Sequence, residues 1–185
     1  MKKSKTSYIT RAQYFIRQIA QYIDPENYTF DDIAYQVDRF NLMYHRHVIF
    51  AHGATRIALI TSDYVVKVDY DDWQIVCFGG CENEMNIYDI AKRDGMAYLF
   101  AEITPYVYEG VTYYIMPRVN GIGRYEDEAW EYMTEEESNW CIDHKIFDLH
   151  NENYGWHQGH IVLIDYGACE LLGRRANDDS DVCNF

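Results

Sequence analysis

The pattern of apolar and polar positions predicts two helices at the start of the chain. Apolar side chains in residues 7–23 recur with a period near 3.6, which is typical of an amphipathic helix. Asp24-Pro25 ends this helix, because the residue before a proline avoids the helical conformation. Thr29 is a suitable N-cap with acidic residues after it, so a second helix is predicted from there to about Asn41. We expect this helical pair to provide packing or a partner surface and no chemistry.

From His47 onward the pattern changes to short runs rich in β-branched and aromatic residues, which are typical of strands. Three strands are predicted at 48–50, 56–61 and 64–68, then a helix at 81–95 that ends at Gly95. A hairpin over 99–119 with the turn Glu109-Gly110, a helix over 125–146 and a final strand in 160–167 complete the order. This order predicts an α+β fold.

Composition restricts the classes of function. The chain has 185 residues, 48% of them hydrophobic and 16% aromatic, which suits one compact domain or two small lobes and argues against a disordered protein. Its formal net charge is -14, so we do not expect binding to a nucleic-acid backbone, whose phosphates require Lys and Arg. A basic protein partner, or solubility alone, fits the charge better. An acidic mimic of DNA stays open, although the carboxylates are spread among 16 basic residues.

The five cysteines are odd in number and form no CxxC pair, which favours reduced thiols over disulfides or a zinc site. The basic start has no apolar segment after it, and no apolar run approaches the roughly 18 residues that span a membrane. We therefore expect a soluble, cytoplasmic protein with no membrane partner.

A polar stretch near the end of the chain has the chemistry of a metal site. Asp148 and Asn153 are five residues apart, and Asp165 follows at the end of a hydrophobic strand, just before Tyr166-Gly167. Two carboxylates and one amide can surround a hard cation, which prefers oxygen ligands. The histidines nearby have mixed spacing and are interpreted as surface residues rather than zinc ligands.

Lys67 lies in the apolar run 65–68, where an ammonium group is costly to bury unless an anion pairs with it. Glu84 on the following helix is the expected partner, and Glu82 is the alternative because the helix phase is uncertain. An outward position on an edge strand is the competing interpretation. Gly53, between the first two strands, would let the backbone approach phosphates, although an ordinary hairpin turn would have the same sequence.

These motifs resemble those of the protein-kinase-like superfamily over about residues 47–170, and the chain is most similar to the short kinase-like proteins that bacteriophages encode. The run around Lys67 resembles the strand that carries the phosphate-binding lysine, and Glu84 resembles its partner glutamate. Residues 115–119 resemble the hinge that contacts adenine. The resemblance therefore assigns Met116 and Arg118, together with Gly53, to nucleotide binding.

The polar stretch resembles the kinase catalytic loop, and the triplet that begins at Asp165 occupies the place of the Asp-Phe-Gly motif. The resemblance implies that Asp148 orients or deprotonates the acceptor hydroxyl. It also implies that Asn153 and Asp165 bind Mg²⁺, while Lys67 holds the α- and β-phosphates of ATP.

Three departures from the family pattern are visible. Ile146-Phe147 replaces the usual histidine before the catalytic aspartate, the segment from Met116 to Asp148 is short, and few residues follow Gly167. The resemblance thus implies a minimal bilobal kinase-like fold, with an antiparallel N-lobe sheet and a truncated helical C-lobe. The expected division is an N-terminal helical segment at 1–46, an N-lobe at 47–119 and a C-lobe at 120–185.

The sequence favours an ATP-dependent phosphotransferase that uses Mg²⁺. The resemblance further implies that it is phage-encoded and acts on a host protein in the host cytoplasm. The alternative is an inactive kinase-fold protein that inhibits a host partner by binding it, which the acidic composition and the short C-lobe favour. The intact set of Lys67, Asp148, Asn153 and Asp165 favours the enzyme.

Overall fold

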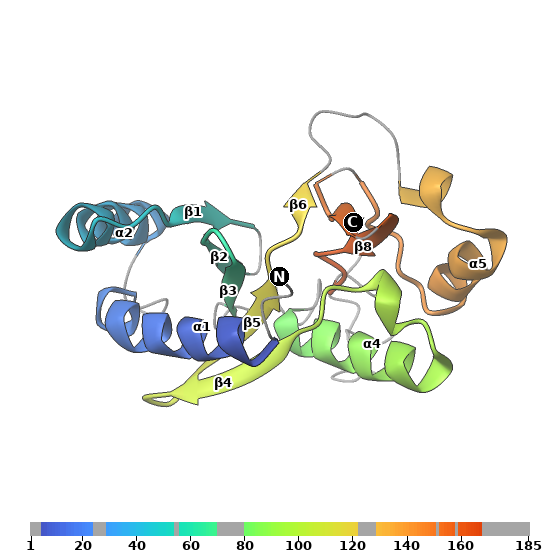
Figure 1. Cartoon of the computed structure of the whole chain (residues 1–185), viewed down its shortest axis with the longest axis horizontal. Helices are drawn as coiled ribbons and strands as arrows, with labels where there is room; N and C mark the ends of the chain where they lie inside the picture. The colour runs from blue at the N-terminus through green and yellow to red at the C-terminus, as the bar shows by residue number, and fades with distance from the viewer. Residues whose placement is uncertain are drawn as a thin grey trace, which may run out of the picture. The chain divides into compact units, whose positions relative to one another are not determined.

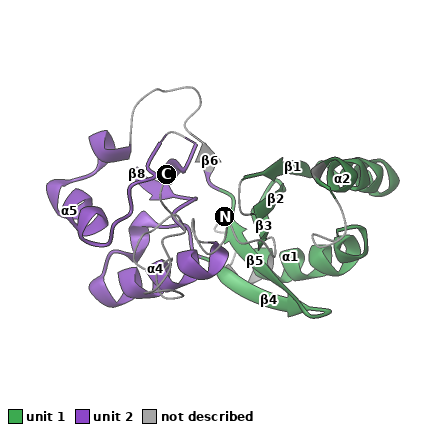
Figure 2. Ribbon diagram, turned by 180° about the vertical axis from the view of Figure 1, so that it is seen from behind, with its two compact units in different colours: residues 1–71, 103–118 green, residues 72–102, 119–185 purple. Residues whose placement is uncertain are grey.

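The computed structural model describes residues 5–23, 29–53, 56–69, 80–121, 129–150, 152–157 and 159–167. The chain divides into two compact units (Figure 2). Unit 1 comprises residues 1–71 and 103–118, and unit 2 comprises residues 72–102 and 119–185. The predicted helix stop at Asp24-Pro25 and the cysteines Cys77, Cys169 and Cys183 lie outside the described residues.

Unit 1 is an antiparallel sheet packed against two helices (Figure 1). The helical part is α1 (Lys5–Ile19), the 3₁₀ turn η1 (Ala20–Tyr22) and α2 (Phe30–Tyr44). The strands are β1 (Ile49–His52), β2 (Arg56–Ile60), β3 (Tyr64–Asp69), β4 (Thr104–Tyr108) and β5 (Val111–Pro117). Their order in the sheet is β1-β2-β3-β5-β4, so β3 is the central strand.

The second helix begins where the sequence predicts. Thr29 caps α2 with a capping box. Its side chain accepts a hydrogen bond from the N–H of Asp32, and the Asp32 side chain accepts one from the N–H of Thr29. The helix continues three residues beyond the predicted end at Asn41, because the chain first enters the left-handed conformation at His45 (φ 51°). Asn41 stays helical, and its side-chain amide holds the backbone of Val48 through two hydrogen bonds of 2.8 and 2.9 Å.

The core of unit 1 lies between the helices and one face of the sheet. Alternate residues of β3, Tyr64, Val66 and Val68, are buried there with apolar side chains from both helices. Phe15 of α1 and Phe40 of α2 meet edge to face, with ring centroids 5.7 Å apart. The helical pair is therefore part of the sheet's own core.

Unit 2 contains helices and a small second sheet. Its elements are α4 (Cys81–Asp94), η2 (Ala97–Leu99), β6 (Asn120–Gly121), η3 (Ala129–Tyr132), α5 (Glu135–Asp143), β7 (Tyr154–His157) and β8 (His160–Leu163). Strands β6, β7 and β8 form an antiparallel sheet in that order. As predicted, α4 ends at Gly95, which adopts the left-handed conformation with φ 80°.

The long helix predicted over 125–146 is wrong in its extent. The described part of this range holds only η3 and α5, and residues 125–128 lie outside the described residues. The break has a local cause, because Thr134 is extended (ψ 163°) and forms a capping box with Glu137 that starts a new helix. Likewise β4 begins only at Thr104, since residues 97–99 form a 3₁₀ turn.

The α+β prediction is confirmed, and the predicted order of three strands, a helix and a hairpin is the order observed along the chain. Within the described residues, no helix combines the length and apolarity that crossing a bilayer requires.

We predict that Phe40→Ala lowers the free energy of unfolding by about 3–5 kcal/mol, because it removes a fully buried ring between α1, α2 and the sheet. Leu42→Ala on the same helix is the matched control. Its side chain is 79% exposed, so a change below about 0.5 kcal/mol is expected. Urea unfolding followed by circular dichroism measures both, and equal effects would contradict a shared core.

Candidate functional site

The segment after α5 directs Asp148 toward solvent. Ile146 and Leu149 are fully buried, whereas Phe147 and Asp148 between them are exposed. The N–H of Ile146 donates to the carbonyl of Cys141 (2.9 Å), which anchors the start of the segment to α5. Ile146 therefore anchors the chain by apolar burial, in the region where the kinase pattern has a histidine.

Asn153 ties this loop together and to the segment after β8. Its Nδ2 donates to the carbonyl of Asp148 at 2.9 Å, and its side chain is almost fully buried. Its own carbonyl accepts from the N–H groups of Ile164 (2.8 Å) and Asp165 (3.3 Å). The loop of Asp148 and Asn153 is thus joined to Asp165 through the backbone in unit 2.

His150 is a contact of Asp148 that the sequence interpretation missed. The N–H of Glu152 donates to Nδ1 of His150 (3.3 Å). Nε2 lies 3.3 Å from Oδ1 of Asp148 and 3.1 Å from Nδ2 of Asn153. Because His150 contacts both, it orients the Asp148 carboxylate from within the loop. In the sequence, the only indication of this contact is that His150 stands two positions after Asp148.

The triplet after β8 is held by the first turns of α4. The N–H of Tyr166 donates to Oε1 of Glu84 (3.3 Å), and Nδ2 of Asn83 donates to the carbonyl of Gly167 (3.3 Å). The buried Tyr166 hydroxyl donates to the carbonyl of Ala101 (2.7 Å). These contacts fix the backbone on the C-terminal side of Asp165, while Asn153 fixes it at Asp165 itself.

The phase of α4 distinguishes its two candidate carboxylates. Glu84 is fully buried and Glu82 is exposed, which favours Glu84 as the carboxylate that serves an internal role. Its ion pair with Lys67 would join two residues of different units, and it stays a prediction.

Lys67 lies on the central strand of unit 1, which excludes the edge-strand interpretation. Its Cα pairs with those of Ala58 in β2 and Tyr114 in β5, and its side chain is only 6% exposed. By strand alternation it lies on the sheet face opposite Val66 and Val68, and therefore opposite α1 and α2. Met116 pairs with Val65 on that same face and is also buried.

The other two nucleotide-site candidates have weaker structural support. Arg118 is exposed, and its Nη1 donates to the carbonyl of Thr61 (2.8 Å), so it stabilises the β2–β3 turn. Gly53 follows β1, and a Cβ built there meets no atom within 4 Å. Glycine at this position is therefore not required by packing. The roles of Gly53, Met116 and Arg118 in nucleotide binding stay predictions.

The described residues give little support to a cysteine nucleophile or to a metal cluster formed by protein side chains alone. Burial raises the pKa of the Cys141 thiol to about 12, so it stays protonated and is not a nucleophile near neutral pH. Among the described residues, no three or more His, Cys, Asp or Glu side chains form a group suited to a metal ion. A cation here would need the Asn153 amide oxygen or a ligand from its substrate.

Comparisons with known proteins find matches among solved structures. No family model and no curated protein matches the chain. Among solved structures, the Legionella pneumophila Lpg2603 kinase bound to IP6 aligns with a TM-score of 0.43 and 15% identity. The alignment covers 73% of this chain and 52% of that one, so this chain spans about half of that chain's length. It adds no functional assignment.

We predict that Asn153→Ala lowers the free energy of unfolding by about 1–3 kcal/mol, because it leaves the Asp148 carbonyl without its amide donor in a buried setting. Asn86→Ala, at an exposed position of α4, is the control and should change stability by less than about 0.5 kcal/mol. Chemical denaturation measures the difference. If the two variants were equally stable, the Asn153 amide would not hold the loop.

Proposed function

We propose that this chain is an ATP-dependent phosphotransferase whose reaction centre is the loop of Asp148 and Asn153 together with Asp165. The observation that supports this most is the Asn153 carbonyl, which accepts hydrogen bonds from Ile164 and Asp165 and so joins the two segments. Phosphoryl transfer requires few protein groups, mainly oxygen ligands for a metal and a residue that orients the attacking hydroxyl.

The oxygen donors present fit Mg²⁺. Mg²⁺ is usually held by one or two carboxylates plus substrate phosphates and keeps several waters, so a full protein cage is not needed. Asn153 is anchored through Nδ2, and its Oδ1 has no hydrogen bond within the described residues. The Asp165 carboxylate and this Oδ1 would bind the ion, which when present neutralises the phosphate oxygens.

Asp148 is suited to orient the acceptor. Its carboxylate is 46% exposed, so a hydroxyl from a substrate can reach it, and Nε2 of His150 contacts its Oδ1. Its backbone carbonyl is held by Asn153 at 2.9 Å, which limits the motion of the residue. Asp148 would accept a hydrogen bond, and then the proton, from that hydroxyl.

Lys67 supplies the cation for the phosphates in this proposal. Lys67 is buried on the central strand, on the sheet face opposite α1 and α2, and its ammonium group would pair with the phosphates of ATP. Met116 shares its sheet face and is buried there, and its contact with adenine stays a prediction. A phage origin and a host protein as the phosphate acceptor, both implied by the family resemblance, stay predictions.

The first test is transfer from radiolabelled ATP, with autophosphorylation and generic protein acceptors as readouts. We expect Asp165→Ala to lower the rate by roughly 100-fold or more, because it removes a ligand of the metal that neutralises transition-state charge. Asp143→Ala, an exposed acid at the end of α5, should have wild-type activity. Equal rates in the two variants would remove Asp165 from the site.

The second test is nucleotide binding, measured by the shift of Tm. Saturating ATP with Mg²⁺ stabilises the folded state by about 2.7 kcal/mol at 100 times Kd, and Lys67→Ala should reduce that shift strongly. Lys92→Ala, exposed on α4, is the control and should retain it. A shift without any transfer would favour the inactive, partner-binding alternative, whereas no shift in the wild type would contradict nucleotide binding.

A further inference from the structure

Unit 1 contains a cavity of about 920 Å³ that the proposed reaction does not use. It lies between α1, the segment that links α2 to β1, and the β2–β3 turn. This volume is in the range of pockets that hold small organic ligands. Every residue that lines it belongs to unit 1, so the cavity exists within one compact unit.

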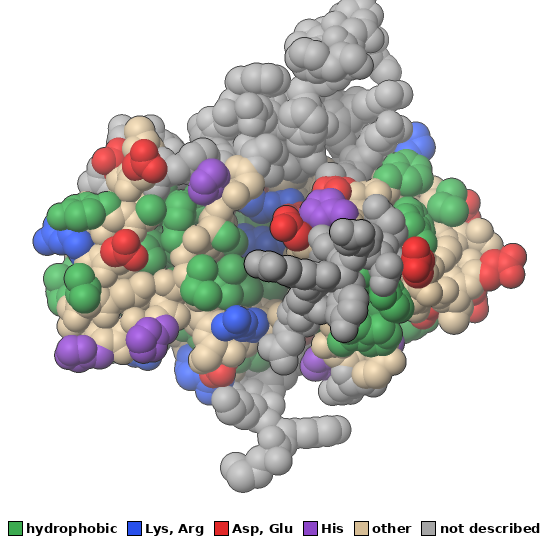
Figure 3. All heavy atoms as spheres, turned by 90° about the horizontal axis from the view of Figure 1, so that it is seen from above, with side chains coloured by type: hydrophobic (Ala, Val, Ile, Leu, Met, Phe, Trp, Pro, Cys, Tyr) green, Lys and Arg blue, Asp and Glu red, His purple; other side chains and the backbone are tan. Residues whose placement is uncertain are grey.

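The cavity contains more positive than negative charge, although the whole chain carries -14. Acidic, basic and hydrophobic side chains are interspersed on the face that Figure 3 shows. In the cavity, by contrast, two guanidinium groups, Arg11 and Arg46, oppose a single carboxylate, Asp63. His45 and His47 beside Arg46 supply ring nitrogens that can hydrogen-bond to a ligand.

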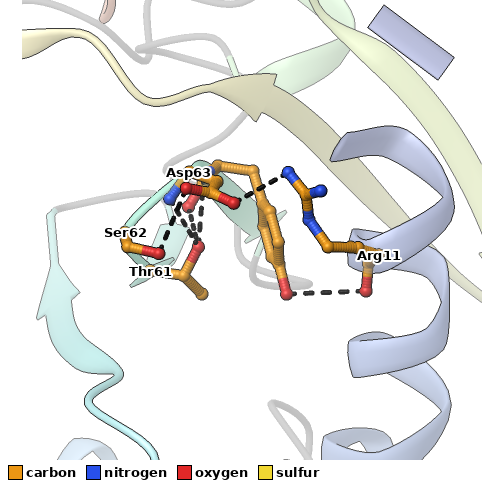
Figure 4. Close-up of polar contacts among 5 residues, drawn as sticks. Arg11, Thr61, Ser62 and Asp63 are labelled. Atoms are coloured by element: carbon orange, nitrogen blue, oxygen red, sulfur yellow. Dashed lines mark hydrogen bonds and ion pairs between the residues drawn. The ribbon is translucent and has the colours of Figure 1, made fainter. Parts of the chain in front are cut away.

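The two arginines of the cavity differ in their interaction partners. Arg11 points from α1 toward Asp63 and forms an ion pair of 2.7 Å with it (Figure 4). Arg46 is exposed, and within the described residues its guanidinium has no hydrogen bond or ion pair. Burial raises the pKa of the Tyr64 hydroxyl, and the charges of Arg46 and Arg11 offset part of that rise, so both charges act on the same point of the cavity.

The walls of the cavity are fixed before any ligand binds. In the β2–β3 turn, the Thr61 hydroxyl donates to the Tyr64 carbonyl (2.8 Å) and the Ser62 hydroxyl donates to the Asp63 carboxylate (3.2 Å) (Figure 4). On the opposite wall, Asn41 holds the backbone of Val48 just after the basic segment. A preformed site loses less conformational entropy on binding.

The charged groups of the cavity favour a ligand that carries a phosphate group. A guanidinium group binds phosphate through paired N–H donors, and Arg46 has its donors available. Asp63 is paired with Arg11, so Arg46 supplies the net positive charge of the cavity, which suits one phosphate better than a polyphosphate. The rings of Tyr14, Phe15 and Tyr64 give the cavity apolar surfaces beside the charged groups.

We propose that this cavity binds a single phosphate monoester whose organic part is apolar, with Arg46 as the phosphate ligand. The phosphate can be carried by a small molecule or by a phosphorylated side chain of a protein, because both present the same chemistry. The proposal does not depend on the proposed phosphotransferase activity, and either can fail alone.

The test is a titration of the full chain with phenyl phosphate, followed by calorimetry and by ¹⁵N chemical shifts. We expect saturable binding in the wild type, with the largest shifts at His45, Arg46 and Val48. Arg46→Ala and Arg46→Gln should weaken it about tenfold to a hundredfold, because a charge-assisted hydrogen bond is lost. Arg39→Ala is the control, since Arg39 lies over the Tyr35 ring on α2 outside the cavity.

The source of the phosphate is distinguished by further probes. A phosphotyrosine peptide that binds more tightly than phenyl phosphate, with no binding of its unphosphorylated form, indicates a phosphoprotein ligand. Tighter binding of phenyl phosphate indicates a small molecule. Addition of ATP with Mg²⁺ should not displace either probe. Absence of saturation up to millimolar probe, equal affinity in the Arg46 and Arg39 variants, shifts centred elsewhere, or displacement by ATP would each overturn the proposal.

Discussion

The candidate reaction centre depends on one backbone carbonyl, that of Asn153, which accepts two N–H groups from the segment after β8. Without this junction the loop of Asp148 and the triplet at Asp165 would be separate surface turns. The junction is backbone to backbone, so it does not itself use the side chains of Asp148, Asn153 and Asp165. The buried amide of Asn153 then fixes the loop internally, through the carbonyl of Asp148.

A second constraint is the burial of ionic side chains. Lys67 on the central strand of unit 1 and Glu84 on α4 of unit 2 are both withdrawn from solvent, and each is costly to bury without compensation. Glu84 accepts the N–H of Tyr166, so at least one of its oxygens stabilises the backbone next to Asp165. Such positions are more readily explained by function than by stability, since an apolar residue would be easier to bury at either one.

Much of the fold could be predicted because its signals are local. The structure agrees with four such local signals: the run around Lys67, the caps at Thr29 and Gly95, and the turn Glu109-Gly110.

Other features do not follow from local sequence. The break before α5 is one of them, because Thr134 is equally compatible with a position inside a helix and with an N-cap. Strand β7 was missed because its Gly155 and His157 lack strand character, and its pairing with β8 supplies what the local sequence does not. The contacts of His150 with Asp148 and Asn153 depend on the loop's conformation, which residue spacing cannot provide.

The central claim is that Asn153 and Asp165 form one oxygen-rich cation site. Titration of the ¹⁵N-labelled protein with Mn²⁺ in the presence of ATP tests it directly, because the paramagnetic ion broadens nearby amide resonances. The account predicts that the amides of Asn153, Ile164 and Asp165 broaden first and together. Broadening centred on the exposed acids at the start of α5, or spread evenly over the chain, would contradict it.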